Sequence, residues 1–331
     1  MQQELLTIDK VKDLISAGET LLLAGEESLL EKLPKGKWIG GTIPYFISSD
    51  KGGLVAKDKI FVTNISMITA STEIKIYTKD SLGEVYSDAG DRGFSFIIIP
   101  ASSEAHISFA LNAPNYKDFG SQPLIGWISG VHLDELGKVA PKTFDGNTGG
   151  SYENEAVVMH VTLKEGKTVD VGIINSFQQG DGDTLTFDTD GFSNNEVMVN
   201  GVKEKFAAYM EENNFDTKFP LVADYCGAMI NTSFQQVDDD GVVHFYAPVF
   251  KDVQYKHAKQ TGDYAAAFNN QLLENNISGV NIAFSCNCIL NYLFSGLEGQ
   301  KTDPFVGPIT FGEIAYQLLN QTLVYLTVID S

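Results

Sequence analysis

The stretch that decides the expected fold runs from Asn281 to Ser331 and reads NIAFSCNCILNYLFSGLEGQKTDPFVGPITFGEIAYQLLNQTLVYLTVIDS. Its pattern predicts a strand, a loop, a helix and a final strand. Within it, Phe311-Gly312-Glu313-Ile314 is expected at a strand-to-helix turn, where glycine permits a tight backbone. Glu313 would then fall in the first helical turn, where a carboxylate suits the helix dipole. This position fits either an ordinary helix start or a carboxylate that receives the ammonium group of a ligand.

The composition of the chain argues against several classes of protein. With 331 residues, 43% of them hydrophobic, the chain can bury a full core, so a disordered protein is not expected. Its 23 basic and 43 acidic residues give a net charge of −20, which disfavours nucleic acid and anionic membranes as partners. The sequence shows no apolar run long enough to insert into a membrane and no basic n-region of a secretory signal. These features and the three cysteines predict a cytoplasmic protein.

The turn-forming residues from Asp145 to Ser151 predict a boundary between two domains, residues 1–147 and 148–331. In the first domain the apolar spacing predicts helices over 8–17, 26–33 and 103–112, and strands over 20–24, 38–46, 59–68, 73–77, 94–99 and 124–132. In the second domain it predicts one hairpin from 155–163 and 168–175, another from 234–237 and 242–249, and helices over 202–212 and 264–275.

These elements predict an α+β protein with two mixed, mostly antiparallel sheets flanked by helices. A weak internal echo connects the two ends of the chain. Gly41-Thr42-Ile43-Pro44-Tyr45 and Gly307-Pro308-Ile309-Thr310-Phe311 share the pattern Gly-x-Ile-x-aromatic, and each follows a predicted strand and helix. Two related halves packed as one unit would produce such an echo, and so would chance.

The motifs near the C-terminus resemble those of the FIST family. There, a strand ending in Phe-x-Cys, a Gly-x-x-x-aromatic-Gly-Glu-Ile turn and an Asn-x-Thr before the last strand recur together. The corresponding segments here are Phe284-Ser285-Cys286, Gly307 to Ile314, and Asn320-Gln321-Thr322. The resemblance implies a sensory module that binds a small ligand such as an amino acid, and it favours a binding protein over an enzyme.

The chain departs from the FIST pattern at two places. In the N-terminal half, Gly40-Gly41-Thr42 matches the family turn, but Ile43-Pro44-Tyr45 replaces its Gly-Glu. In the C-terminal half, Ile289 stands where the family carries an arginine, the natural bidentate partner of a ligand carboxylate. These departures imply either a changed ligand or a lost site.

The resemblance also implies a ligand site built mainly from the C-terminal half. Glu313 would receive a ligand cation, and Asn320 and Thr42 would form hydrogen bonds. Phe311 and Tyr255 would supply apolar walls. The remaining two expected site residues are Cys286 and His257.

Other chemistries remain open on the residues alone. Cys286 and Cys288, two apart on a strand, could bind zinc with Cys226 and His244, although their spacing is not that of a zinc motif and we expect no metal. A hydrolase or transferase that uses Cys286 or a carboxylate pair is one alternative function, and a haem-based gas sensor with His257 as the axial ligand is another.

The main hypothesis is a stand-alone small-ligand sensor that has no cofactor. It would signal through a separate partner protein, and a homodimer is compatible with it.

Overall fold

The computed structural model describes residues 2–225, 227–259, 266–267, 269–271 and 281–330. These residues form mixed sheets with short helices, in agreement with the expected α+β class. They form four six-stranded sheets and one three-stranded sheet, where the sequence predicts two sheets. None of the described helices is both long enough and apolar enough to cross a membrane.

Three of the six-stranded sheets share one strand order. In each, two central parallel strands are joined by a short helix and flanked on both sides by antiparallel strands. The first sheet runs β1 (Gln2–Leu6), β6 (Ile60–Asn64), β2 (Leu21–Gly25), β3 (Trp38–Thr42), β10 (Thr143–Asp145) and β11 (Gly150–Tyr152). The second runs β7 (Thr69–Tyr77), β12 (Ala156–Leu163), β8 (Gly93–Pro100), β9 (Leu124–Ser129), β25 (Glu313–Ala315) and β26 (Gln317–Leu319). The third runs β13 (Lys167–Asn175), β27 (Thr322–Asp330), β23 (Asn281–Cys288), β24 (Gly307–Thr310), β4 (Tyr45–Ser48) and β5 (Gly52–Val55).

The chain therefore repeats one unit three times. Each repeat consists of an outer strand, a parallel pair with its helix, a hairpin and a return strand. The helices between the parallel strands are α2 (Glu27–Leu30), α3 (Glu104–Asn112) and α6 (Ile289–Phe294). Each hairpin joins the sheet of another repeat: β4–β5 lies in the third sheet, β10–β11 in the first and β25–β26 in the second.

This exchange of hairpins places the expected boundary at residue 147 within one of the exchanged hairpins. Residue 147 lies in the turn between β10 and β11, and all three sheets contain strands from both sides of it. Only the long-range strand pairing reveals the third repeat, because the repeats share little sequence.

The parallel pairs show the equivalence of the repeats residue by residue. The second strand of each pair ends in a buried hydroxyl residue that pairs with the last residue of the first strand: Thr42, Ser129 and Thr310. Three residues earlier, Gly126 and Gly307 approach the neighbouring strand closely. A Cβ atom there would lie 1.8 Å and 1.9 Å, respectively, from a carbonyl oxygen of that strand, so only glycine fits. The two similar sequence segments therefore lie on equivalent strands, β3 and β24. The structural alignment of Thr42 with Thr310 differs by two residues from the sequence alignment of Gly41 with Gly307.

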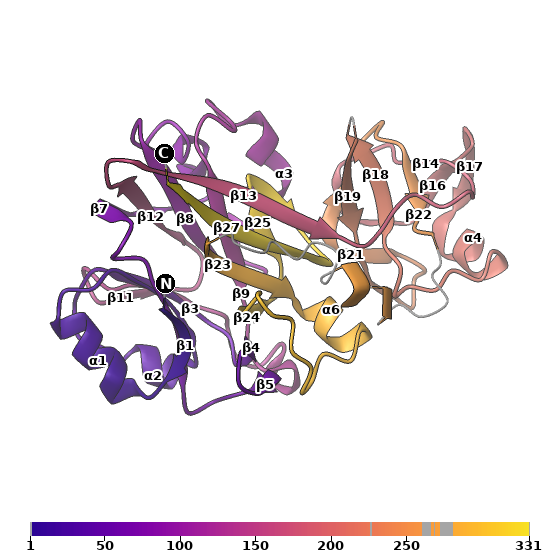
Figure 1. The fold of residues 1–331 in the computed structure, drawn as a ribbon. Helices are drawn as coiled ribbons and strands as arrows, with labels where there is room; N and C mark the ends of the chain where they lie inside the picture. The colour runs from indigo at the N-terminus through magenta and orange to yellow at the C-terminus, as the bar shows by residue number, and fades with distance from the viewer. Residues whose placement is uncertain (1, 226, 260–265, 268, 272–280, 331) are drawn as a thin grey trace.

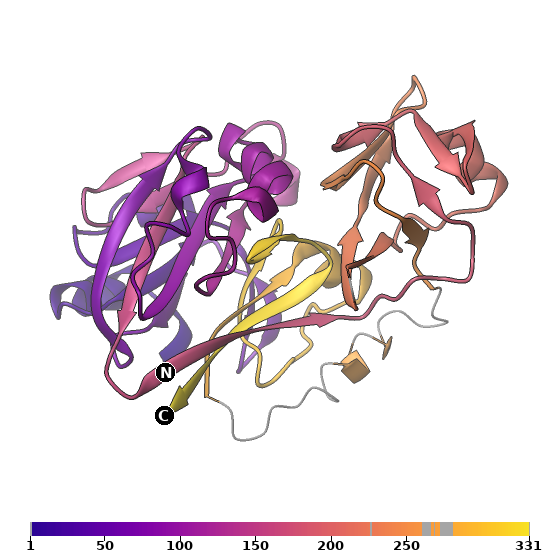
Figure 2. The ribbon, with the colours of Figure 1, turned by 90° about the horizontal axis from the view of Figure 1, so that it is seen from above.

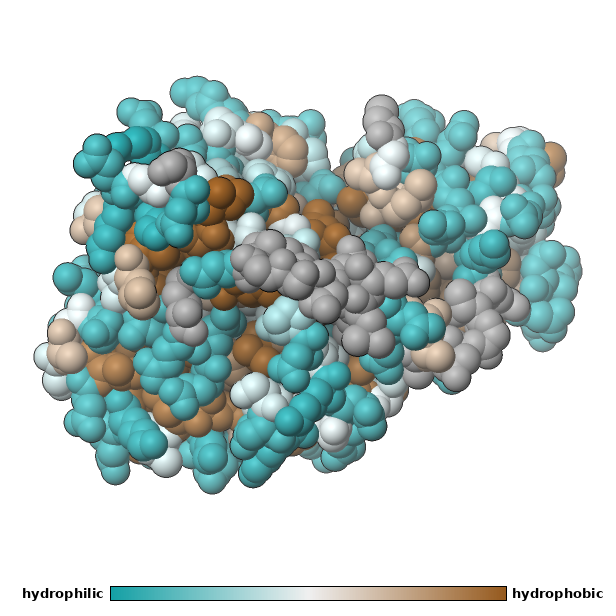
Figure 3. Space-filling model, viewed as in Figure 1, coloured by the Kyte–Doolittle hydropathy of each residue, from teal (hydrophilic) through white to brown (hydrophobic). Residues whose placement is uncertain are grey.

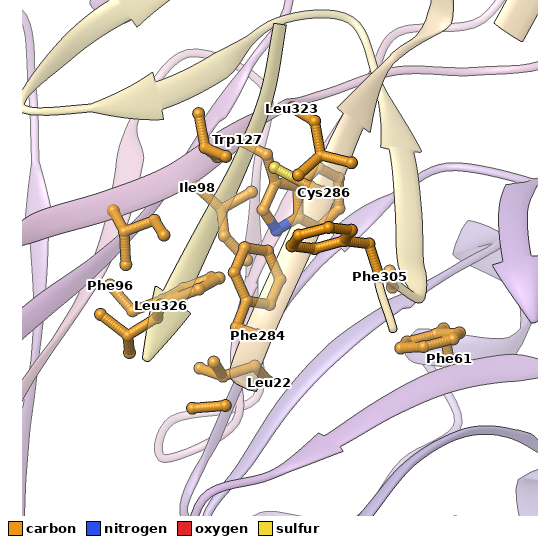
Figure 4. Close-up of a cluster of buried hydrophobic side chains, with 14 of the residues drawn as sticks. Leu22, Phe61, Phe96, Ile98, Trp127, Phe284, Cys286, Phe305, Leu323 and Leu326 are labelled. Atoms are coloured by element: carbon orange, nitrogen blue, oxygen red, sulfur yellow. The ribbon is translucent and has the colours of Figure 1, made fainter. Parts of the chain in front are cut away.

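The main core lies where the three sheets meet. Leu22 comes from the first sheet, Ile98 and Trp127 from the second, and Phe284 and Leu323 from the third, and all are buried in one cluster. Figure 4 shows these side chains gathered together. Strand β8 also serves a second core on its other face, beneath α3, which explains why almost all of its residues are apolar.

A separate lobe is inserted between β13 and β23. Its elements are β14 (Leu185–Thr186), β15 (Gly191–Asn194), β16 (Glu196–Val199), β17 (Val202–Lys205), α4 (Phe206–Glu212), β18 (Leu221–Tyr225), β19 (Ala228–Thr232), β20 (Phe234–Val237), β21 (Val243–Val249) and β22 (Tyr255–His257). They surround their own core of aromatic and aliphatic residues. At the same place the first repeat carries only α1 (Ile8–Ser16) and the second a short 3-10 helix, Leu82–Glu84. Figures 1 and 2 show the lobe beside the main body, with β13 extending toward it.

Several expected elements are confirmed, among them the helices at 8–17 and 103–112 and the hairpin of β20 and β21. The expected hairpin of 155–163 and 168–175 is wrong, because β12 pairs with β7 and β8 whereas β13 pairs with β27. Strand β12 is buried along almost its whole length, so it requires a neighbour on each side.

The sequence also misassigns two helices. The helix expected over 202–212 starts only at Phe206, because the preceding residues form β17 and pair with β16 across the Asn200-Gly201 turn. The helix expected after Gly312 is the short strand β25, which pairs with β9. Most of the helix expected over 264–275 lies outside the described residues.

Candidate functional site

A cavity of about 360 Å³ lies between the main body and the lobe. Its walls on the body come from the segment after β8, the start of α6, and the loops that hold Phe311 and Asn320, and its walls on the lobe come from β15, β20 and β21. Figure 3 shows the surface notched between the body and the lobe, with apolar residues near the bottom. The lining residues are Ala101, Ser102, His106, Ile107, Leu133, Leu136, Phe192, Ser193, Gln235, His244, Phe245, Tyr246, Cys288, Ile289, Leu290, Leu293, Phe311 and Asn320.

The repeated topology explains why a cavity forms here. Strands β8 and β23 are the first strands of two parallel pairs, and α3 and α6 start near their carboxyl ends. A crevice outside the carboxyl ends of parallel strands is a common place for ligands in α/β sheets. The lobe covers this crevice, since β21 contacts α3 and the Phe192 ring lies edge-to-face with His106.

His106 is held in one tautomer by the loop before α3. The Ser103 hydroxyl caps the helix by accepting the backbone N–H of His106 at 3.0 Å. The backbone N–H of Ser102 donates to Nδ1 of His106 at 3.1 Å, so the ring hydrogen lies on Nε2. Ser102 adopts a left-handed backbone with φ of 61°, a strained conformation for a residue other than glycine.

The free nitrogen of His106 is a neutral hydrogen-bond donor. Burial lowers the pKa of His106 to about 4, so the ring carries no charge near neutral pH. Among the described residues, Nε2 has no hydrogen-bond partner, although the atom is buried. An unpaired buried donor costs about 1–3 kcal/mol of stability, and such atoms call for a structural or functional explanation.

Asn320 is the second cavity residue with an unpaired polar atom. One end of its side-chain amide lies 2.7 Å from the Ser233 hydroxyl of the lobe, whose single hydrogen is also within reach of Oε1 of Gln321. The other end of the amide is buried and has no partner in the described part of the chain. Asn231, also of the lobe, donates to the backbone carbonyl of Asn320 at 3.1 Å. Asn320 therefore lies where polar contacts fasten the lobe to the body.

The remaining cavity walls are mostly apolar, with a few neutral polar side chains such as Ser193 and Gln235. None of its described lining residues is Asp, Glu, Lys or Arg. Among these described residues, His244 has its Nε2 2.8 Å from Oδ2 of Asp238, which is not itself part of the lining. A charged ligand would thus meet no opposite charge on these walls.

Glu313 lies behind the cavity, on strand β25, and does not line it. Its Oε2 accepts from the backbone N–H and the hydroxyl of Thr322 at 3.2 Å and 2.8 Å. Burial raises the pKa of Glu313 to about 8 despite these hydrogen bonds, so the side chain is largely protonated at neutral pH. The position expected for Glu313, in the first turn of a helix, is wrong because Glu313 begins strand β25.

The two described cysteines differ in position. Cys286 belongs to the main core, and its thiol donates to the carbonyl of Gly126 at 3.6 Å. Cys288 lines the cavity and precedes α6. Burial raises the pKa of both thiols, which disfavours the thiolate that a nucleophile or metal ligand needs. No group of potential metal ligands occurs among the described residues, and Cys226 lies outside them.

The remaining expected site residues lie elsewhere. Tyr255 and His257 belong to β22 in the lobe. Tyr255 is buried in the lobe core, and the His257 ring stacks on Phe215 with centroids 4.1 Å apart. Nε2 of His257 lies 3.1 Å from the backbone carbonyl of Asp216, a contact that an iron at this nitrogen would displace. Thr42 accepts the backbone N–H of Lys142 at 2.9 Å and lines a different hollow, near Glu26.

Of the residues expected from the sequence, Phe311 and Asn320 meet at the cavity, and Glu313 and Cys286 lie behind it. His106 and Phe192 were not expected as site residues, and Cys288 was considered only as a metal ligand. The one local signal for this site is the pair Ser102-Ser103, which suits a helix cap after a buried strand, the place where βα loops carry ligand contacts.

Comparison with known families gives one finding. Residues 6–329 match the profile of a family of unknown function, DUF6976. No match to a curated protein was found. Because the match spans nearly the whole chain, the protein belongs to the DUF6976 family.

Proposed function

We propose that this protein binds a small molecule in the cavity between the main body and the lobe. The observation that carries the proposal is a largely apolar cavity lined by two buried polar side chains, His106 and Asn320, each with an atom that has no partner among the described residues. Ligand pockets characteristically combine apolar walls with a few polar groups that orient the ligand.

The size of the cavity supports a ligand smaller than most drugs. An engineered apolar cavity of roughly 150 Å³ holds one benzene molecule in another protein. The cavity here, at about 360 Å³, has room for roughly twice that volume. It falls at the lower end of the usual range for ligand pockets, roughly 300–1,000 Å³.

The position of the cavity supports a sensory role. Both the body and the lobe supply walls, so a bound ligand would contact both and favour one arrangement of the two. We propose that this change is passed to a separate partner protein in the cytoplasm, and a homodimer is compatible with this scheme. The relation to FIST modules is part of the same proposal.

Thermal unfolding against a panel of small neutral compounds, carboxylates and amines tests the binding role. A ligand at about a hundredfold its dissociation constant adds roughly 2.7 kcal/mol to native-state stability, which raises the melting temperature by several degrees. Leu293 lines the cavity and is 47% exposed, so Leu293→Trp should fill space there without disturbing the core. Ile329→Trp, on a residue that is 49% exposed and outside the cavity lining, is the matched control.

We expect at least one compound to raise the melting temperature of the wild type and of Ile329→Trp, but not that of Leu293→Trp. A compound that stabilises all three proteins equally would bind elsewhere and contradict the proposal.

A further inference from the structure

From the chemistry of the cavity walls we infer that the ligand is a neutral, largely apolar molecule with a carbonyl-type acceptor, which binds the Nε2–H of His106. This inference rests on the proposed binding function and adds the class of ligand to it.

The hydrogen on Nε2 fixes the sense of the first hydrogen bond. Because Nδ1 accepts from the backbone of Ser102, Nε2 can only donate. The group opposite it must be an acceptor, such as the oxygen of a ketone, ester or amide. A deprotonated carboxylate is also an acceptor. The charge of the cavity walls must therefore distinguish carboxylates from neutral carbonyl compounds.

The absence of Lys, Arg, Asp and Glu from the described walls disfavours ionised ligands. A carboxylate would lose its hydration without gaining Lys or Arg, and an ammonium would lose its hydration without gaining Asp or Glu. Glu313, the acidic residue among the expected site residues, does not line the cavity, and its Oε2 already accepts hydrogen bonds from Thr322. Neutral carbonyl compounds escape this desolvation penalty.

Asn320 can form a second hydrogen bond with either a donor or an acceptor group of the ligand. In the present orientation Nδ2 is the unpaired end and would donate to an acceptor. If the amide turned by half a revolution, it would keep contact with Ser233, since a hydroxyl can donate or accept, and would offer Oδ1 instead. His106 therefore sets the class of ligand, and Asn320 accommodates a second polar group.

Four probes of nearly equal size separate these classes: benzylacetone as the neutral carbonyl compound, hydrocinnamate as the anion, phenylpropylamine as the cation, and butylbenzene as the apolar reference. Dissociation constants come from methyl NMR titrations of the full-length protein, whose spectra also verify the fold of each variant. We expect benzylacetone to bind the wild type most tightly, and Leu293→Trp to weaken every probe that binds.

Two variants of His106 test the named donor. His106→Asn can retain an acceptor for Ser102 but lacks a donor at the Nε2 position, whereas His106→Gln places an amide nearer that position. We expect His106→Asn to lower the preference for benzylacetone over butylbenzene by about tenfold to a hundredfold, because the donor is lost. His106→Gln should retain more of that preference.

Each other outcome has a defined meaning. Tighter binding of hydrocinnamate or phenylpropylamine than of benzylacetone overturns the inference on ligand class and leaves the binding function standing. Equal affinity for benzylacetone and butylbenzene in the wild type also overturns it, whether or not the His106 variants fold. If none of the four probes binds the wild type, both the inference and the proposed function fail.

Discussion

The replacement Glu313→Gln should change how protein stability depends on pH. The carboxyl group is fully buried, and burial raises its pKa from the ordinary value of 4.5 to about 8. Between these two values the folded chain holds a proton that the unfolded chain releases. Stability therefore falls as pH rises through this window, by about 1.4 kcal/mol per pH unit, and the loss is complete only above the folded pKa.

Glutamine cannot ionise, so the variant lacks this loss. The free energy of unfolding of Glu313→Gln, minus that of the wild type, should increase by about 2.5 kcal/mol between pH 5 and pH 7. The amide oxygen can still accept from Thr322, so any cost of the replacement itself is a constant offset. Urea unfolding at several pH values, followed by the fluorescence of the buried Trp38 and Trp127, measures the difference.

Glu165→Gln, at an exposed turn, controls for the change of net charge. A difference between Glu313→Gln and the wild type that stays flat from pH 5 to pH 8 would refute the raised pKa. It would also restore the option of an ionised Glu313 that meets a ligand cation.

Two further predictions concern the fold. Gly126→Ala should destabilise the protein by about 1–3 kcal/mol or more, because the new Cβ would clash with the carbonyl of Ile97. Gly90→Ala is the control, since Gly90 has open space around it and the variant should differ little from the wild type. Equal urea midpoints for the two variants would contradict the close approach of the strands at Gly126. Tyr77→Phe should cost about 1–3 kcal/mol, because the Tyr77 hydroxyl donates to Oδ2 of Asp88 at 2.7 Å and lies 2.8 Å from Nε2 of the buried His160. An unchanged free energy of unfolding would show that these two contacts together contribute little.

Local patterns predict the elements of this protein better than their pairing. Helix α1 follows from the spacing of Val11 and Ile15, and the turn at Asn200-Gly201 follows from the preference of these residues for positive φ, which both adopt. The partners of β12 and β13 lie far away in the sequence, so no local pattern specifies them.

The site was harder to predict for the same reason. Phe311 and Asn320 come from the segment with the clearest motifs, and the structure places both at the cavity. His106 belongs to a different repeat, and its role depends on a backbone contact with Ser102 that no spacing rule reveals. The resemblance to FIST motifs predicts a ligand contact for Glu313, yet this side chain is fully buried and does not line the cavity.

A ligand site between the body and the lobe is tested most directly by locating bound benzylacetone through its intermolecular nuclear Overhauser effects to protein methyl groups. We expect contacts to the methyl groups of Ile107, Ile289 and Leu293, which line the cavity from α3 and α6, and none to Ile329. Contacts confined to methyl groups outside the cavity lining, or none at a saturating concentration, would contradict a ligand site between the body and the lobe.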